Sequence, residues 1–378
     1  GMYLGSIDLD TYELWLLNED GSKMIKKTVQ YNAGLFKIFD EIVANATDHY
    51  IRIKSLIDAG KDVAPVKDIR IDIDRLTGVI KVYNSGEGIE ITEHPEHKIY
   101  IPELIFGNML TSTNYTDDNR MGVGTNGIGS KATNIFSQTF EVETVDATRK
   151  LLYKQRFESN MSVTKPPSIT KCAKKPYTAI TFKPDYKRFN LEGLSDDMYE
   201  VMRKRTYDLC AVTDKDVNVY FNGVKLEFKS FEKYVDLYLG SKSEHTRVYE
   251  SINDRWEVIA SYNSFNGFEQ VSFVNGLLTI RGGKHVEYIV NQIVKKTSEL
   301  ISKKTKATNV ATNKAIKDNL IIFIKCSILN PAFDSQSKET LTTPATKFGS
   351  KAEISDKFID KLYKSGLADK VLEICAIH

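Results

Sequence analysis

One segment near the start of the chain, residues 34–57, constrains the fold most, because its apolar residues repeat with the period of an α-helix. At about 100° per residue, Leu35, Ile38, Phe39 and Ile42 fall on one face. An amphipathic helix of this length needs another layer to cover its apolar face. We therefore predict one long helix that packs against a sheet or a second helix.

The segments around this helix alternate with period two, which predicts β-strands. Residues 68–74 and 79–83 flank Thr77-Gly78 and predict a hairpin. Further strands are expected at 138–144, 150–157, 177–183, 217–228, 255–263, 269–280 and 319–328. Further helices are expected near 195–211, 284–304 and 351–377. This order predicts an α+β fold in two domains, residues 1–229 and 230–378.

Composition excludes several classes of protein. The 378 residues carry 52 Lys+Arg and 50 Asp+Glu, so a contact with nucleic acid would need a local patch. We find no apolar run of about 18 residues and no signal peptide, so we expect neither a membrane span nor secretion. The four cysteines are widely spaced and match no zinc pattern, which is typical of reduced thiols inside a cell.

A polar stripe runs along the helix predicted at 34–57. Glu41, Asn45 and Asp48 stand at positions i, i+4 and i+7, which places two carboxylates and an amide on one face. Such a set can hold hydrated Mg²⁺ and orient a water molecule, because Mg²⁺ prefers oxygen ligands and keeps several of its waters. Taken alone, such a stripe is more often a solvated helix face.

Two glycine-containing segments follow. In NSGEG at 84–88, the glycines allow a tight turn after a strand, and the Asn84 amide is suited to read the edge of an adenine base. The loop GVGTNGIGSK at 122–131 precedes a helix predicted over 130–136, and its backbone N–H groups favour phosphate oxygens. Its spacing is neither the Walker A pattern nor a Rossmann fingerprint. Each segment alone also fits a plain turn or a flexible loop.

In this order, the patterns E-x-x-x-N, N-x-G-x-G and G-x-x-G-x-G resemble those of the GHKL (Bergerat-fold) ATPases. That superfamily includes gyrase-type topoisomerases, heat-shock chaperones, sensor histidine kinases and mismatch-repair ATPases. The resemblance narrows with FDEIVANATD at 39–48, LIFGNMLTSTNY at 104–115, SFVNG at 272–276 and GGKH at 282–285. These segments look like those of eukaryotic-type type IIA DNA topoisomerases.

The most specific match is NPAFDSQSKETL at 330–341, which resembles the NPxFDSQTKE segment of the same family. Chaperones and histidine kinases lack this segment. The similarity covers about residues 3–375, so the chain is identified as a member of the family through its ATPase region. Two departures are Asn84, where the superfamily commonly has Asp, and Ser337, where the family has Thr.

The resemblance implies a GHKL (Bergerat) ATPase α/β sandwich followed by a transducer domain with a ribosomal protein S5 domain 2-like fold. It implies ATP and Mg²⁺ as cofactors, Glu41 as general base and Asn45 as Mg²⁺ ligand. Gln336 and Lys338 would reach the γ-phosphate of ATP from the second domain and stabilise its charge. The other residues expected at the nucleotide are Asp48, Asn84, Gly88, Ser112, Thr113, Asn114, Gly124, Thr125, Asn126, Gly127, Ile128, Gly129, Ser130, Lys131 and Ser337.

The resemblance also implies how the nucleotide would act on DNA. Mg-ATP would close the N-gate of a homodimer around a transported DNA duplex, and hydrolysis would reset it during double-strand passage. Lys303, Lys304 and Lys306 are expected to contact DNA phosphates without regard to sequence, unless they only form a solvated helix end. The DNA-cleaving regions would follow residue 378. A full-length enzyme would work inside the cell, in a nucleus or a viral or phage replication compartment.

Three rival functions remain at this point. A nucleotide-driven clamp without strand passage is disfavoured by the long match around Gln336 and Lys338. A mismatch-repair ATPase would lack the SFVNG and NPAFDSQ segments. An inactive paralogue kept for dimerisation would not need Glu41, Asn45 and Lys338 intact. DNA-stimulated turnover of ATP would separate the topoisomerase from a generic clamp.

Overall fold

A computed structural model describes residues 4–108, 128–263, 267–305 and 311–377. The chain divides into two compact units, Gly1–Ser230 and Phe231–His378. Both units combine helices with sheets, so the predicted α+β fold class is confirmed. None of the helices in the described ranges has the length and apolar character needed to span a membrane.

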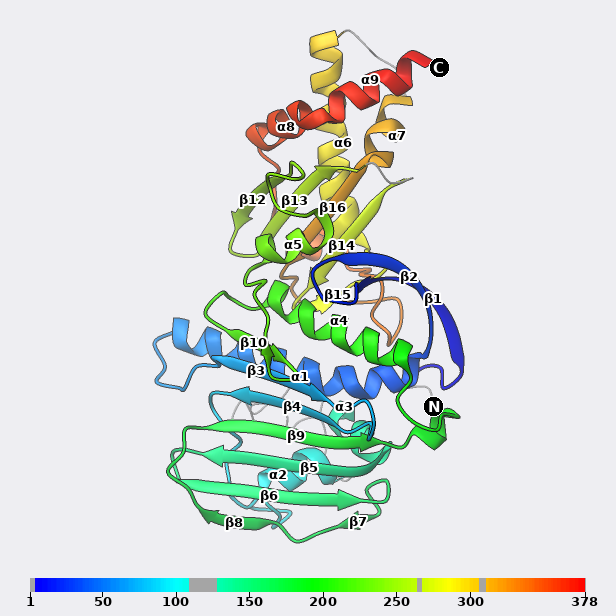
Figure 1. Cartoon of the computed structure of the whole chain (residues 1–378). Helices are drawn as coiled ribbons and strands as arrows, with labels where there is room; N and C mark the ends of the chain where they lie inside the picture. Colours follow the sequence, from blue (N-terminus) through cyan, green and yellow to red (C-terminus); the bar gives the residue numbers. More distant parts are fainter. Residues whose placement is uncertain (1–3, 109–127, 264–266, 306–310, 378) are drawn as a thin grey trace. The chain divides into compact units, whose positions relative to one another are not determined.

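A nine-stranded sheet forms the centre of the first unit, in the order β11-β10-β3-β4-β9-β5-β6-β7, with β8 paired to β6 (Figure 1). Among the described strands of this sheet, β10 and β3 form the one parallel pair. The predicted hairpin is confirmed, because β3 and β4 pair antiparallel, and the buried residues of β3 are alternate isoleucines. The strands are β3 (Asp68–Ile73), β4 (Ile80–Ser85), β5 (Ser137–Asp146), β6 (Leu151–Glu158), β7 (Val163–Thr164), β8 (Ser168–Lys171), β9 (Tyr177–Pro184), β10 (Asn218–Phe221) and β11 (Val224–Lys225).

Helices pack on the apolar side of this sheet. The long helix α1 (Ala33–Asp58) contacts β4, and α3 (Ile128–Ile135) contacts α1, β5 and the short helix α2 (Ile101–Gly107). Leu35, Ile38 and Phe39 of α1 are fully buried, so the predicted helix and its apolar face are confirmed. The helix α4 (Asp196–Val212) packs beside α1, and a 3₁₀ turn (Tyr186–Phe189) precedes it.

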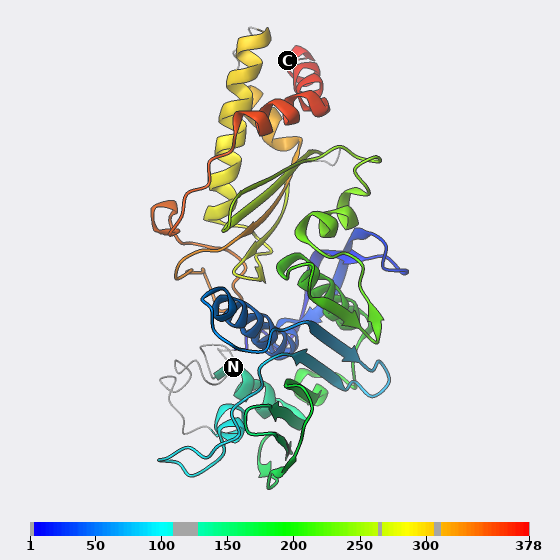
Figure 2. The same ribbon diagram turned by 90° about the vertical axis from the view of Figure 1, so that its left-hand side faces the viewer.

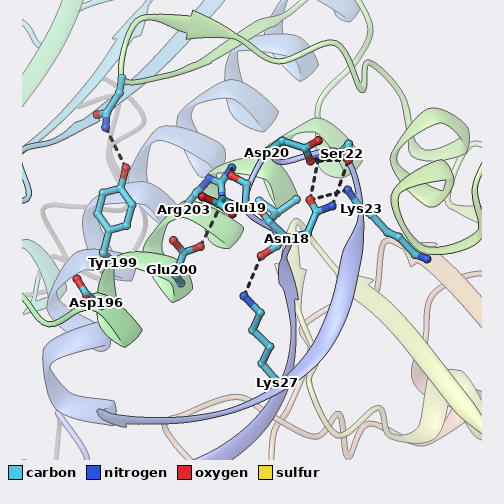
Figure 3. Close-up of polar contacts among 12 residues, drawn as sticks. Asn18, Glu19, Asp20, Ser22, Lys23, Lys27, Asp196, Tyr199, Glu200 and Arg203 are labelled. Atoms are coloured by element: carbon cyan, nitrogen blue, oxygen red, sulfur yellow. Dashed lines mark hydrogen bonds and ion pairs between the residues drawn. The ribbon is translucent and has the colours of Figure 1, made fainter.

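A separate two-stranded sheet, β1 (Leu9–Leu17) and β2 (Met24–Asn32), packs against α4. Its turn is closed by Asn18, Asp20 and Ser22, and the Ser22 hydroxyl donates to Asp20 Oδ1 at 2.6 Å (Figure 3). Arg203 of α4 donates to the backbone oxygens of Asn18 and Glu19 at 3.1 and 3.3 Å. The hairpin is therefore fastened at its turn as well as along its buried face.

The second unit is built on a five-stranded sheet in the order β12-β13-β16-β14-β15. The helix α6 (Lys284–Thr305) runs along this sheet and extends beyond it (Figure 2). Trp256, Ile293 and Ile322 belong to the shared core. The remaining elements are α5 (Phe231–Leu239), β12 (Val248–Asn253), β13 (Trp256–Tyr262), β14 (Glu269–Val274), β15 (Leu277–Leu278), α7 (Ala311–Asp318), β16 (Leu320–Cys326), a 3₁₀ turn (Ala345–Lys347), α8 (Asp356–Leu362), a π-helical turn (Tyr363–Leu367) and α9 (Ala368–Ile377).

Two segments expected as single strands are hairpins instead. Residues 217–228 contain β10 and β11, and residues 269–280 contain β14 and β15. Both turns are Asn-Gly pairs, Asn222-Gly223 and Asn275-Gly276, and all four residues have positive φ. A turn of this kind needs positive φ at both central positions, which Asn and Gly tolerate best, so the chain reverses there. The short helices α2, α5 and α7 were also not predicted.

Candidate functional site

The polar stripe of α1 carries an ion pair. Lys37 Nζ lies 2.8 Å from Glu41 Oε1, and the two side chains are only 15% and 16% exposed. Asn45, one turn further on, is half-buried, whereas Asp48 is exposed. The helix thus presents a carboxylate and an amide side by side in a partly buried position. Polar contacts with a ligand are stronger there than at a fully hydrated surface.

The segment after β4 is packed against β5. Gly88 has no room for a side chain, since a Cβ there would lie 2.0 Å from the backbone oxygen of Val145. The next residue, Ile89, donates its N–H to Thr144 Oγ1 at 3.0 Å. Glycine is therefore required at position 88 by contact with a neighbouring strand, and the role of Gly88 at the nucleotide stays a prediction.

A small cavity opens where α1, α2, β4 and β9 meet. It has a volume of about 20 Å³ and is lined by Ile42, Asn45, Ala46, Val82, Asn84, Phe106, Thr178 and Ile180. This volume suffices for about one water molecule. Its polar lining includes the side chains of Asn84 and Thr178, which are register partners in the pairing of β4 with β9. Asn84 is buried and donates to the backbone oxygen of Ser85 at 3.1 Å.

Sequence reasoning did not identify Thr178. Its hydroxyl is also 2.9 Å from the hydroxyl of Thr144, so it belongs to the hydrogen bonds that hold the segment after β4. The only signal in the sequence is its place on a predicted strand. Nothing in that pattern says that β9 lies beside β4, because the two strands are almost a hundred residues apart.

The helix α3 begins at the end of the glycine-rich loop. Ser130 and Lys131 are buried in its first turn, and burial lowers the pKa of Lys131. Asn45 Nδ2 donates to Ser130 Oγ at 2.6 Å. Asn45 therefore touches Ser130 and also lines the cavity with Asn84, which brings three separate sequence motifs together. The expected residues Ser112, Thr113, Asn114, Gly124, Thr125, Asn126 and Gly127 lie outside the described residues.

A contact with α4 also fixes the orientation of α1, and sequence reasoning did not identify it. Arg205 of α4 is buried, and its Nε donates to Asp40 Oδ1 at 2.6 Å. Burial is the largest single influence and lowers the pKa of Arg205, but the carboxylates of Asp40, Asp208 and Asp48 together outweigh it and the pKa is raised. Asp40, the partly buried member of this ion pair, stands directly before Glu41 in the sequence.

The expected γ-phosphate residues lie in the second unit. Gln336, Ser337 and Lys338 are all exposed, and the Ser337 hydroxyl is 2.6 Å from that of Ser335. Lys338 has φ +54°, a left-handed conformation that is uncommon for lysine and often found at functional sites. Its N–H donates to the backbone oxygen of Ser335 at 3.1 Å.

The strand-like segment after this loop is joined to the start of α6. Leu341 N–H donates to Gly282 O, and Lys284 N–H donates to Leu341 O, both at 3.0 Å. A Cβ on Gly283 would lie 2.3 Å from Leu341 O, so only glycine fits there. Arg281 adds an ion pair with Glu339 at 3.0 Å. The GGKH motif thus fastens the Gln336–Lys338 loop to α6.

Two of the expected DNA-contacting lysines, Lys303 and Lys304, are at the other end of α6. Lys303 is exposed. Lys304 lies 3.8 Å from Asp360 Oδ1 and 4.7 Å from the centre of the Tyr363 ring, so part of its charge is engaged within the unit. Lys306 lies outside the described residues.

Comparisons with known proteins show which family the chain resembles. The family model described as DNA gyrase B matches residues 230–377. DNA topoisomerase 2 of Candida glabrata is 44% identical over 98% of this chain, which spans 27% of that relative's length. The crystal structure of the ATPase region of Saccharomyces cerevisiae topoisomerase II has a TM-score of 0.85 and 44% identity, covering 99% of this chain and 94% of that one.

A further solved structure contains the ATPase and transducer domains of DNA topoisomerase II from Balamuthia mandrillaris. It has a TM-score of 0.85 and 37% identity, and the match covers 100% of this chain and 94% of that one. These neighbours bear out the predicted fold, an ATPase domain followed by a transducer domain. The chain belongs to the family of eukaryotic-type type IIA DNA topoisomerases and corresponds to their ATPase region.

Proposed function

We propose that this chain binds and hydrolyses Mg-ATP and acts as the ATP-driven N-gate of a type IIA DNA topoisomerase. Membership of a family of ATPase regions implies nucleotide binding. The observation that carries the proposal is the position of Asn45, which lines the cavity with Asn84 and contacts Ser130 at the end of the glycine loop. Residues 1–229 would form the GHKL ATPase domain and residues 230–378 the transducer domain.

The residues at this position fit a magnesium ion. The amide nitrogen of Asn45 is hydrogen-bonded to Ser130. The amide oxygen is a suitable ligand for a hard cation such as Mg²⁺. Among the described residues no group of three or more His, Cys, Asp or Glu side chains could hold a metal, so the remaining ligands would be phosphate oxygens and water. A bound Mg²⁺ would neutralise charge on the phosphates.

Each side chain then has a role in the reaction. Glu41 orients the attacking water and accepts its proton. The N-terminus of α3 and the cation of Lys131 attract the phosphates, with Gly124–Gly129 and Ser112–Asn114 as further contacts. Asn84 and Thr178 recognise adenine across the small cavity, directly or through one water. Asp48 supports the pocket from its exposed position on α1.

The Gln336–Lys338 loop gives the site two states. Lys338 and Gln336 would bind the γ-phosphate of ATP and stabilise its charge during transfer, with Ser337 beside them. ADP has no γ-phosphate, so the loop would lose this contact after hydrolysis. A contact made in one nucleotide state and not in the other is what an ATP-driven switch requires.

The proposal also covers the dimer and its contact with DNA. The curated relative is a DNA topoisomerase, and this chain spans about a quarter of its length. We infer a homodimer that closes around a double-stranded DNA segment, with Lys303, Lys304 and Lys306 contacting phosphates without sequence preference. The full-length protein would act inside a cell or in a viral replication compartment during relaxation and decatenation, without contact with a membrane.

Steady-state hydrolysis of Mg-ATP, with and without duplex DNA, tests the proposal. Glu41→Ala should lower kcat by at least about 100-fold, because general base catalysis contributes that much, while binding of a non-hydrolysable ATP analogue is kept. Lys338→Ala should likewise retain binding and lose hydrolysis. Equal turnover by the parent and Glu41→Ala would show that Glu41 is not the base. Stimulation by DNA would favour the topoisomerase over a generic ATP-driven clamp.

A further inference from the structure

The chain is nearly neutral as a whole, but one of its segments is strongly basic. Residues 148–176 contain eight Lys or Arg side chains and one acidic residue, Glu158, so their net charge is +7, whereas the whole chain has a net charge of +2. This segment forms β6, β7 and β8 at one edge of the nine-stranded sheet (Figure 1). The eight cations are Arg149, Lys150, Lys154, Arg156, Lys165, Lys171, Lys174 and Lys175.

Three of these cations are engaged in ion pairs and five are not. The pairs are Arg149 with Glu90 and Asp146, Lys154 with Glu143, and Arg156 with Glu141 and Glu158. Each of these carboxylates is thus already offset by a cation. The five remaining lysines are exposed and form no ion pair with any residue that the structure describes. They are Lys150, Lys165, Lys171, Lys174 and Lys175.

The unpaired lysines are spread along β6 instead of gathering at one point. Cys172 N–H donates to Lys150 O at 2.9 Å at the start of the strand, and Lys165 N–H donates to Arg156 O at 3.0 Å near its end. Residues 150 and 156 are about 20 Å apart at about 3.3 Å per residue. A DNA duplex carries about one phosphate charge per 1.7 Å of its axis, so about twelve lie along this length. The edge therefore suits a polyanion better than a single anion.

A hollow of about 380 Å³ continues the basic surface onto the face of the sheet. Lys81, Arg156 and Lys165 contribute to its lining. Lys81, Thr181, Glu141 and Arg156 are neighbours in the pairing of β4, β9, β5 and β6. Lys81 is exposed and, like Lys165, forms no ion pair with the described part of the chain. The basic surface is therefore concave and reaches from the edge across three further strands.

The residue types favour a nucleic acid over a protein partner. Protein interfaces are depleted of lysine and enriched in aromatic residues, Met and Arg. Here every unpaired cation is a lysine, and Val163 is the one large apolar side chain of residues 148–176 that is exposed, at 38%. The two aromatic rings of this segment, Tyr153 and Phe157, are buried, so neither can stack on the bases of a single strand. Lysines bind phosphates as point charges, which suits a duplex backbone.

We propose that the β6–β8 edge, residues 148–176, is a second binding surface for duplex DNA and contacts its phosphates without sequence preference. The inference rests on the proposed function, in which the partner is duplex DNA. It adds a contact in the first unit to the one expected at Lys303 and Lys304 in the second. Lys165, Lys171, Lys174 and Lys175 are the residues to test, because each is exposed and unpaired within the described ranges.

The experiment measures binding of a labelled mixed-sequence duplex to the 378-residue chain by fluorescence anisotropy, in EDTA and from about 50 to 200 mM KCl. The β6–β8 variant combines Lys165→Gln, Lys171→Gln, Lys174→Gln and Lys175→Gln. It should bind at least about tenfold more weakly at low salt. Each lost phosphate contact reduces the salt slope of log K by about 0.9, so the slope should shrink by about 3 to 4. Its Tm should change little, because no ion pair is broken.

The matched control combines Lys23→Gln, Lys61→Gln, Lys215→Gln and Lys225→Gln. These four lysines are also exposed residues of the first unit without an ion pair in its described part. Their replacement changes the net charge by the same amount. The control should bind within about threefold of the parent, because phosphate contacts act over short distances in salt. Equal weakening of both variants would show an effect of net charge alone and overturn the inference.

Two other results would also contradict the proposed surface. Lysines on an edge strand can serve only to hinder pairing with another chain. If the β6–β8 variant binds DNA like the parent but aggregates more readily, the lysines protect the edge and do not bind DNA. If polyglutamate displaces the labelled duplex as effectively as unlabelled duplex does, the surface is suited to acidic protein segments instead.

A comparison with the second unit separates this inference from the proposed function. If Lys303→Gln with Lys304→Gln weakens DNA binding and the β6–β8 variant does not, the second surface is absent while the proposed function stands. If the parent itself does not bind the duplex at about 50 mM KCl, where phosphate contacts are strong, the DNA contact of the proposed function fails as well.

Discussion

Thr178 and Asn84 are register partners in the pairing of β9 with β4, and both line the small cavity beside α1. Each side chain alone is an ordinary strand residue. Together they offer an amide and a hydroxyl around a space of about 20 Å³, enough for about one water. Hydrogen-bonding groups in an otherwise apolar pocket can distinguish one base from another, because a base that fails to pair with them leaves them unsatisfied.

Thr178→Val should weaken ATP binding about tenfold, because it removes one hydrogen bond at nearly constant volume. The preference for ATP over GTP should fall with it, as measured by competition against a fluorescent ATP analogue. Thr181→Val is the control, since Thr181 lies on the same strand and lines a different groove, beside Lys81 and Arg156. Equal losses in both variants would show a general effect on β9 and contradict adenine recognition by Thr178.

The helix α1 is held on two sides. Arg205 of α4 pairs with Asp40 at 2.6 Å, and α3 binds α1 through Ser130 and Thr133. Asp40 and Glu41 are about 100° apart around the helix, so a contact that fixes Asp40 also fixes the direction of Glu41. Displacement of a reacting group by about 1 Å can cost about 100-fold in rate, so this support matters for catalysis.

Arg205→Met should lower the free energy of unfolding by about 3–5 kcal/mol, because Asp40 is left as a charge without its partner in a partly buried place. Arg205→Met combined with Asp40→Leu should recover most of that loss, since apolar side chains can replace a buried ion pair at little cost. Urea unfolding followed by circular dichroism measures both. Arg75→Met is the control. Its partner Asp196 is 89% exposed, so the loss should stay below about 1 kcal/mol.

Each of the two units contains a buried histidine that makes its stability depend on pH. His49 in the first unit and His285 in the second are both buried, and burial lowers the pKa of each to about 3. His285 also lies 2.9 Å from the Ser272 hydroxyl. In an unfolded chain a histidine has a pKa of about 6.5. Between pH 3 and pH 6.5 the unfolded state binds more protons than the folded state. The folded state therefore becomes more stable as the pH rises to about 6.5 and less stable as the pH drops below that value.

Each buried histidine should therefore cost about 1.4 kcal/mol of stability per pH unit below about 6.5. Between pH 7.5 and pH 5.0, His49→Gln or His285→Gln should reduce the acid-induced loss by about 2 kcal/mol in the unfolding transition of its own unit. Urea unfolding at the two pH values measures this difference. His97→Gln, which replaces an exposed histidine, should leave the loss unchanged. If His49→Gln loses as much stability in acid as the parent does, His49 is not the source of the acid sensitivity of the first unit.

The sequence predicted local features well and long-range contacts poorly. The bounds of α1, the hairpin of β3 and β4 and the stripe of Glu41 and Asn45 follow from periodicity, because they depend on neighbours within a few residues. Thr178 and Arg205 were missed, because their partners lie about a hundred or more residues away and no periodicity encodes such pairs. Similarity to a known family located Lys338, which composition and spacing alone would have left as an ordinary loop lysine.

The junction between the Gln336–Lys338 loop and the first turn of α6 has a mechanical consequence. Backbone bonds from Leu341 to Gly282 and Lys284 make the stem of the loop and the root of the helix one stiff body. The 22 residues of α6 form a rod of about 33 Å with Lys303 near its tip. A tilt of about 10° at the root would sweep that tip through about 6 Å, roughly one helical turn. Any such tilt at the root of α6 would therefore be magnified at its tip.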